Sequence, residues 1–173
     1  MAGSAILFRR LFLGASMLWA ATIPFATRMA SLDGSSTAGY LIAATVYATG
    51  SLVCHQLPQR SFHLWGHQLP VCARCTGLYF GAAAAALVAL VSRPTGSRLA
   101  QAGVRARLTV LAVAAAPAAL TLVYEWTTGT MPSNVIRAFT GVLLGAATMW
   151  IIVDAMEEPI HGLPAIERPR AME

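Results

Sequence analysis

The chain has 173 residues, of which 57% are hydrophobic and only 11% are charged. Charged residues make up about a quarter of an ordinary soluble protein, so this composition excludes a soluble domain and is typical of an integral membrane protein. The formal net charge is +5, but no basic cluster contains interleaved aromatic residues, so the sequence does not indicate nucleic-acid binding. The partner that it does indicate is the lipid bilayer.

Five apolar segments follow one another along the chain, separated by polar connections. A helix that crosses a bilayer core needs about 20 apolar residues, and tilting or local thinning of the bilayer accommodates somewhat shorter segments. We therefore predict an all-α, polytopic integral membrane helix bundle with about five transmembrane helices. The predicted spans are residues 11–26, 38–53, 78–91 with an extension back to about residue 71, 108–126 and 135–153.

The first segment follows Arg9 and Arg10 and has small residues near Ala20 and Ala21, a pattern that also fits the core of a signal peptide. We interpret it as a retained helix because further membrane segments follow it.

We expect residues 1–156 to form a single transmembrane helical domain. Residues 157–173 contain three prolines among acidic residues and arginines, and we predict that they form a polar C-terminal tail.

The connection over residues 92–107 carries four arginines, so the positive-inside rule predicts that it lies in the cytoplasm. Because five spans place the two termini on opposite faces, we expect the C-terminus in the cytoplasm and the N-terminus outside. Arg9 and Arg10 favour the opposite orientation, but four arginines outweigh two. The protein is thus expected in the cell inner (cytoplasmic) membrane as a multi-pass protein, with the loop before the third span on the outer face.

That loop, residues 54–77, holds all three cysteines and three of the four histidines. Cys72-x-x-Cys75 places two sulfurs within reach of one ion, and Cys54 supplies a third. Three cysteines and one histidine are a tetrahedral zinc ligand set. We therefore predict a metal site with zinc as the cofactor.

The fourth ligand is left open between two histidines. His55 adjoins Cys54, and adjacent residues often point apart, whereas His67 lies before Cys72 and has room to fold back. We place His55 slightly ahead of His67, and we expect His63 to form ordinary surface hydrogen bonds.

Basic residues accompany this predicted metal site. Three thiolates and one imidazole on Zn²⁺ leave a charge of about −1 by counting, and residues 34–124 contain no Asp or Glu. Arg60 and Arg74 lie in the loop and would balance that charge, so we predict that both bind at the site.

In a five-span chain, the connection between the second and third spans and that between the fourth and fifth emerge on the same face. The loop is therefore expected beside Glu125, Asn134 and Arg137, which we include among the binding residues. Glu125 is the only acid inside the apolar part of the chain. Ionisable groups in membrane spans usually face the bundle interior and pair, so Glu125 is either a proton carrier near the site or part of a structural ion pair.

Two other functions remain open. The first is a membrane thiol–disulfide oxidoreductase linked to quinone, because a Cys72-x-x-Cys75 pair at a helix start has thiolates stabilised by the helix dipole and by Arg74. The second is an accessory subunit of a larger membrane complex. Its partner would bind small-residue helix faces such as Gly77-x-x-x-Gly81 and Gly141-x-x-x-Gly145. The sequence indicates no particular reaction.

The loop and the start of the third span resemble a family of small prokaryotic membrane proteins known as a domain of unknown function. The residues that carry the resemblance are Cys54-His55-Gln56, Arg60-Ser61-Phe62 and Pro70-x-Cys72-Ala73-Arg74-Cys75-Thr76-Gly77-x-Tyr79-x-Gly81. A second patch, Ser133-Asn134-x-x-Arg137-x-x-Thr140-Gly141, resembles that family's junction between the fourth and fifth helices. The resemblance implies a polytopic membrane protein and implies no established activity.

Overall fold

The computed structural model describes residues 2–32, 36–91 and 103–157, with the side chains of residues 2–5 and 157 left aside. Residues 158–173 of the predicted C-terminal tail and residues 92–102 of the arginine-bearing connection lie outside the described part.

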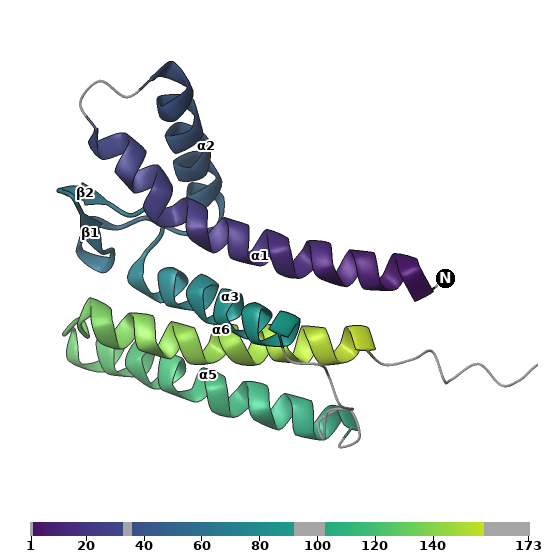
Figure 1. Ribbon diagram of the computed structural model, residues 1–173. Coiled ribbons are helices and arrows are strands. Elements are labelled where there is room, and N and C mark those ends of the chain that lie inside the picture. Colours follow the sequence, from purple (N-terminus) through teal and green to yellow (C-terminus); the bar gives the residue numbers. More distant parts are fainter. Residues whose placement is uncertain (1, 33–35, 92–102, 158–173) are drawn as a thin grey trace, which may run out of the picture.

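The described residues form five long helices, and the prediction of an all-α membrane bundle is confirmed. A short 3-10 helix and a two-stranded hairpin lie between the second and third helices (Figure 1). In chain order the elements are α1 (Ala2–Ser31), α2 (Thr37–Val53), η1 (Pro58–Arg60), β1 (His63–Leu64), β2 (His67–Gln68), α3 (Ala73–Val91), α5 (Gly103–Thr128) and α6 (Asn134–Glu157).

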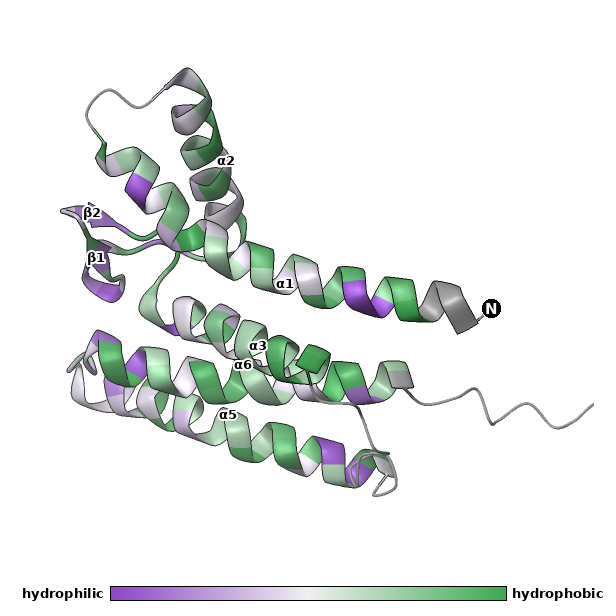
Figure 2. Ribbon diagram, viewed as in Figure 1, coloured by the Kyte–Doolittle hydropathy of each residue, from purple (hydrophilic) through white to green (hydrophobic). Residues whose placement is uncertain are grey.

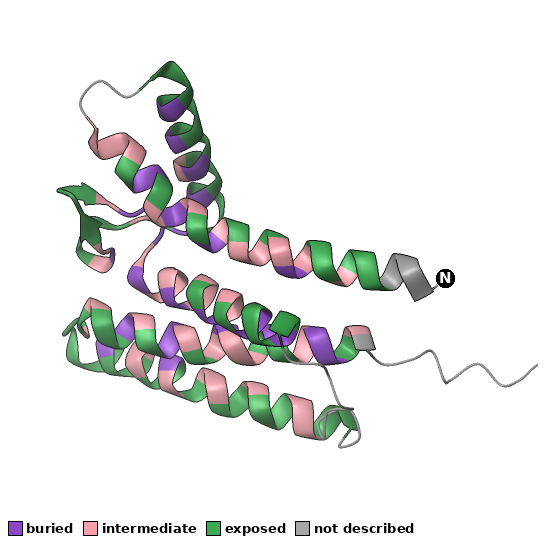
Figure 3. Cartoon of the chain, viewed as in Figure 1, coloured by how far each residue is buried: buried purple, intermediate pink, exposed green. Residues whose placement is uncertain are grey.

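Four of the helices, α1, α3, α5 and α6, are long and apolar enough to cross a membrane, whereas α2 has only 17 residues. Their outward surfaces are hydrophobic and exposed at the same time (Figures 2 and 3). Leu18, Val113 and Leu120, for example, are each more than 60% exposed. Such an apolar outer surface suits a lipid environment. Lipid offers no hydrogen-bond partners, and a helix pairs its backbone groups internally while its apolar side chains need none.

The second helix packs against the C-terminal half of α1. Ser36 caps its first turn by accepting a hydrogen bond from the Gly39 amide (3.2 Å), and Ala43 and Val46 bury themselves against Ala26 of α1. The chain therefore runs out along α1, returns along α2, and enters the loop beside the C-terminal half of α1 (Figure 1).

The start of α1 and the end of α6 lie at the same end of the bundle, in contrast to the expectation of opposite faces. Leu13 packs with Met149 and Val153 in one apolar cluster. At the same end, Arg9 donates to the carbonyl of Ala89 (2.9 Å), and an ion pair joins α5 to α6. The reason for the difference is that α2 is short and packs back along α1, so it does not carry the chain to the other end of the bundle. We call this the arginine end, after Arg9, Arg105 and Arg107, and the opposite end, which carries residues 54–72, the cysteine end.

Helices α3 and α6 cross with their backbones in contact. A Cβ atom added at Gly77 or Gly81 would lie 1.9 Å or 2.2 Å from a carbonyl oxygen of α6. One added at Gly141 or Gly145 would lie 2.2 Å or 2.0 Å from a carbonyl oxygen of α3. The two small-residue faces therefore cover each other inside the chain and offer no free surface to a partner helix.

We expect Gly145→Ala to lower the free energy of unfolding by about 1–3 kcal/mol, because its new methyl group would push α3 and α6 apart. Equilibrium unfolding of the purified protein in detergent measures this. Gly14→Ala is the matched control, since a Cβ atom there meets nothing within 4 Å and alanine favours a helix over glycine. A G145A variant as stable as the G14A variant would contradict the close crossing.

Candidate metal centre

The end of α2 is held against the start of α3 by one side chain. Gln56 has a left-handed backbone (φ 48°), and its side-chain amide donates to the carbonyls of Tyr47 (2.8 Å) and Pro70 (2.7 Å). Gly50 permits this approach, because a Cβ atom there would lie 2.3 Å from the Pro70 oxygen. Cys54, just after α2, is thereby brought next to Cys72, just before α3.

The hairpin closes the loop between these two cysteines. Trp65 and Gly66 at its tip both have positive φ angles (52° and 77°), which suits a two-residue turn between antiparallel strands. Gln68, in β2, donates to the carbonyl of Gln56 (2.5 Å), and its own carbonyl accepts a hydrogen bond from the Tyr47 hydroxyl. The hairpin therefore turns the chain back toward α3, and the side-chain amide of Gln68 is hydrogen-bonded within the loop.

The three cysteine sulfurs lie within 4.8 Å of one another, and all three thiols are free. No other group of three or more cysteine, histidine or acidic side chains within the described ranges could hold a metal ion. Cys54 is buried, and its sulfur accepts a hydrogen bond from the backbone amide of Cys72 (3.1 Å). The cluster is compatible with binding a metal ion.

The surroundings of Cys72 favour the thiolate form that binds metals. A hydrogen bond from the Cys75 thiol lowers the pKa of Cys72 to about 5, and the start of α3 at Ala73 adds the partial positive charge of a helix N-terminus. Both effects favour the thiolate of Cys72, which is the form that binds a metal ion.

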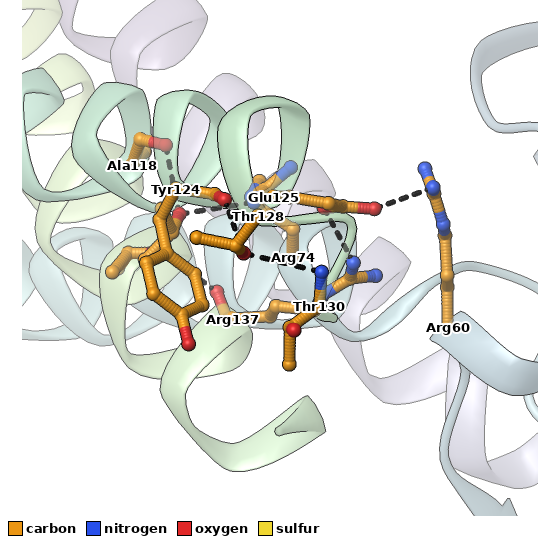
Figure 4. Close-up of polar contacts among 10 residues, drawn as sticks. Arg60, Arg74, Ala118, Tyr124, Glu125, Thr128, Thr130 and Arg137 are labelled. Atoms are coloured by element: carbon orange, nitrogen blue, oxygen red, sulfur yellow. Dashed lines mark hydrogen bonds and ion pairs between the residues drawn. The ribbon is translucent and has the colours of Figure 1, made fainter. Parts of the chain in front are cut away.

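At the same end of the bundle, Glu125 of α5 binds two arginines, as Figure 4 shows. Its Oε1 accepts from Arg60 of the loop (2.5 Å), and its Oε2 accepts from Arg137 of α6 (2.7 Å). Glu125 and Arg137 are both buried, whereas the Arg60 side chain is 38% exposed. One carboxylate thus connects the loop to two helices.

The remaining predicted residues at this end also contact the loop or the neighbouring helices. Asn134, the first residue of α6, donates to the carbonyl of Ser61 (3.0 Å). Arg74, in the first turn of α3, donates to the hydroxyl of Thr121 (3.0 Å). Ser133 accepts a hydrogen bond from the Ile136 amide (3.3 Å) and caps α6.

The three histidines of the loop are not part of the sulfur cluster. His55 is exposed and lines the same cavity as the cysteines. His67 is exposed in β2 and lines a different cavity, together with Tyr40 and Tyr47. His63 is exposed in β1.

A cavity of about 350 Å³ adjoins the three sulfurs. Its lining includes Cys54, Cys72, Cys75, His55, Arg60 and Arg74. The sulfurs therefore border a space that also presents guanidinium groups.

Sequence reasoning did not assign a role to Gln56, Gln68 or Tyr47, although these residues shape the loop. Their contacts join residues that are distant in sequence, and the left-handed backbone of Gln56 leaves no periodic pattern. Only the resemblance, which includes Gln56, contained a signal.

The region of the chain that matches a known family contains this centre. The family model described as "Predicted membrane protein (DUF2085)" matches residues 54–151, more than half of the chain. This match begins at Cys54 and includes every residue named above in the sulfur cluster and the Glu125 ion pairs.

Two archaeal relatives have no assigned activity. An uncharacterized protein of Methanocaldococcus jannaschii is 47% identical over 60 residues, which are 35% of this chain and 38% of the relative. An uncharacterized protein of Methanothermobacter thermautotrophicus is 57% identical over 30 residues, which are 17% of this chain and 27% of the relative. The chain thus matches well under half the length of either relative, and no solved structure matches it.

We expect Arg137→Gln to lower the free energy of unfolding by about 3–5 kcal/mol, because it removes the buried partner of a buried carboxylate. Arg60→Gln is the matched comparison and should cost about 1 kcal/mol or less, since solvent screens the more exposed pair. Unfolding of both variants in the same detergent measures the difference. Equal losses would show that burial does not separate the two ion pairs.

Proposed function

Because this chain belongs to the DUF2085 family of predicted membrane proteins, we propose that it is a multi-pass membrane protein that binds one zinc ion through Cys54, Cys72 and Cys75. The observation that carries this proposal is the convergence of three sulfurs from two chain segments within 4.8 Å. A Zn–S bond of about 2.3 Å places the sulfurs of a tetrahedral site about 3.8 Å apart. The observed group therefore needs only a small contraction to hold the ion.

Zinc fits this donor set better than a hard cation. Thiolates select soft or borderline ions, and oxygen-binding ions such as Mg²⁺ and Ca²⁺ disfavour them. The ion would join the end of α2 to the start of α3, which Gln56 already brings together. Its positive charge would also stabilise the three cysteines as thiolates, which is the form in which they bind a metal.

We expect the protein purified at neutral pH to contain about one zinc ion per chain, as measured by elemental analysis. Cys54→Ser, Cys72→Ser and Cys75→Ser should each lose most of the metal, since each removes one of only three sulfur ligands. Thr49→Ser, which alters an exposed hydroxyl on α2, is the matched control and should retain it. Wild-type protein that folds and takes up no zinc would refute the proposal.

A membrane thiol oxidoreductase is the second candidate, and the same sulfur cluster supports it. The Cys72 and Cys75 thiols would form a disulfide by giving two electrons and two protons to a quinone, which becomes a quinol. Alkylation after mild oxidation separates the two functions. Bound zinc would protect the sulfurs and no disulfide would accumulate, whereas a redox pair would be trapped as the disulfide.

The distribution of arginines supports a proposed orientation in the membrane. Arg9, Arg10, Arg105 and Arg107 all lie in helix segments at the arginine end, so the two arginine groups that conflicted in a five-span arrangement lie at the same end of the bundle. The positive-inside rule then favours a cytoplasmic arginine end and a cysteine end on the outer face of the cytoplasmic membrane.

This orientation is tested with reporter fusions. Alkaline phosphatase, which is active only outside the cytoplasm, should be inactive when fused at residue 173 and active when inserted at the exposed turn at Gly66. Green fluorescent protein at residue 173 should fluoresce. The reverse pattern would invert the proposed orientation.

A further inference from the structure

The cysteine cluster provides three ligands where a zinc ion ordinarily takes four. Structural zinc sites are closed by four protein ligands, whereas a site with three protein ligands keeps one position for water or substrate. Within the described residues, the group that could hold the ion contains the three cysteines and no histidine. The three cysteines also line the adjoining cavity, so a fourth ligand could reach the ion from there.

That cavity is large enough for more than a water molecule. Its volume is about 350 Å³, and a water molecule takes up about 30 Å³ in the liquid. A small organic or inorganic ion of several heavy atoms fits this space beside the sulfurs.

The charges around the cavity are not balanced. Both oxygens of Glu125 are taken, one by Arg60 and the other by Arg137. Arg74 has only the Thr121 hydroxyl as a hydrogen-bond acceptor in the described structure. The Nε atoms of Arg60 and Arg74 are buried and have no hydrogen-bond partner.

The formal charges of these groups indicate the sign of the charge on the missing ligand. A zinc ion with three thiolates carries one negative charge, and so does Glu125. Three arginines oppose these two negative charges, so the centre retains one positive charge. A net positive charge beside the cavity attracts anions, and one small anion would offset it.

We propose that the fourth position on the metal is taken by a small oxyanion, a carboxylate or a phosphate, that enters the cavity and also binds Arg60 and Arg74. Arginine suits this role because its planar guanidinium donates two parallel hydrogen bonds to either group. This inference rests on the proposed metal site, and it identifies the class of ligand for that site.

Cobalt(II) replaces zinc in the test, because the visible bands of a cobalt–thiolate centre respond to a change in the fourth ligand. The detergent-purified, cobalt-loaded protein is titrated with acetate, inorganic phosphate and a short-chain phosphatidate. We expect at least one of them to shift the bands saturably. A response to phosphate identifies a free ion as sufficient, and a response confined to phosphatidate identifies a lipid headgroup as the source.

Two variants link the response to the arginines. Arg74→Gln should lower the affinity for the anion by about tenfold or more, since a hydrogen bond to a charged group contributes about 1.5–3 kcal/mol. Arg28→Gln is the matched control, because Arg28 stacks on Trp65 at 5.4 Å and does not line the cavity. Should R74Q not fold, R60Q provides the same test.

Each failure has its own signature. If wild-type protein shows no cobalt–thiolate bands, the metal site itself is refuted. If the bands appear, do not respond to any of the anions and change when His55 is replaced by alanine, the site is closed by His55 and only the anion inference is overturned. Equal anion affinity of the wild type and R74Q would also overturn it.

Discussion

The close crossing of α3 and α6 is the constraint on which the other features depend. Four glycines let the two backbones touch, and a Cβ atom at Gly141 would lie 2.2 Å from the carbonyl oxygen of Arg74 itself. Because glycine is the residue that allows this distance, the first turn of α3 is held beside Gly141 in the N-terminal part of α6. Arg74, Cys75 and Arg137 therefore lie at the same end of the bundle, next to the loop.

The ion pairs of Glu125 add to the contacts that the helix crossing makes at this end of the bundle. Glu125 receives one arginine from the loop and one from α6, so a single carboxylate joins three segments of the chain. In an apolar surrounding, a charged group must find a partner or a cavity with water. Because acids are scarce in this part of the chain, the ion pair with Glu125 fixes the position of Arg60 and of the loop that carries it.

The sequence predicted the helical membrane bundle well because long apolar runs have no other stable form in lipid. Loop order alone also predicted that Cys54 and Arg60 would lie near Glu125 and Asn134, since connections emerge at alternating ends. The path of α2 was less predictable, because a 17-residue apolar helix is close to the length that crosses a bilayer. Its packing against α1 depends on contacts such as Ala26 with Ala43, and composition does not reveal these.

The hydrogen bonds of Gln56 have a mechanical consequence for the sulfurs. Its amide donates to the Tyr47 carbonyl of α2 and to the Pro70 carbonyl before α3, and Cys54 directly follows α2 in sequence. If α2 tilted away from the start of α3, Cys54 would move with the end of α2 and its sulfur would separate from the other two. If the centre binds a metal ion as proposed, coordination and the docking of α2 would be coupled, and the bound ion would oppose such a tilt.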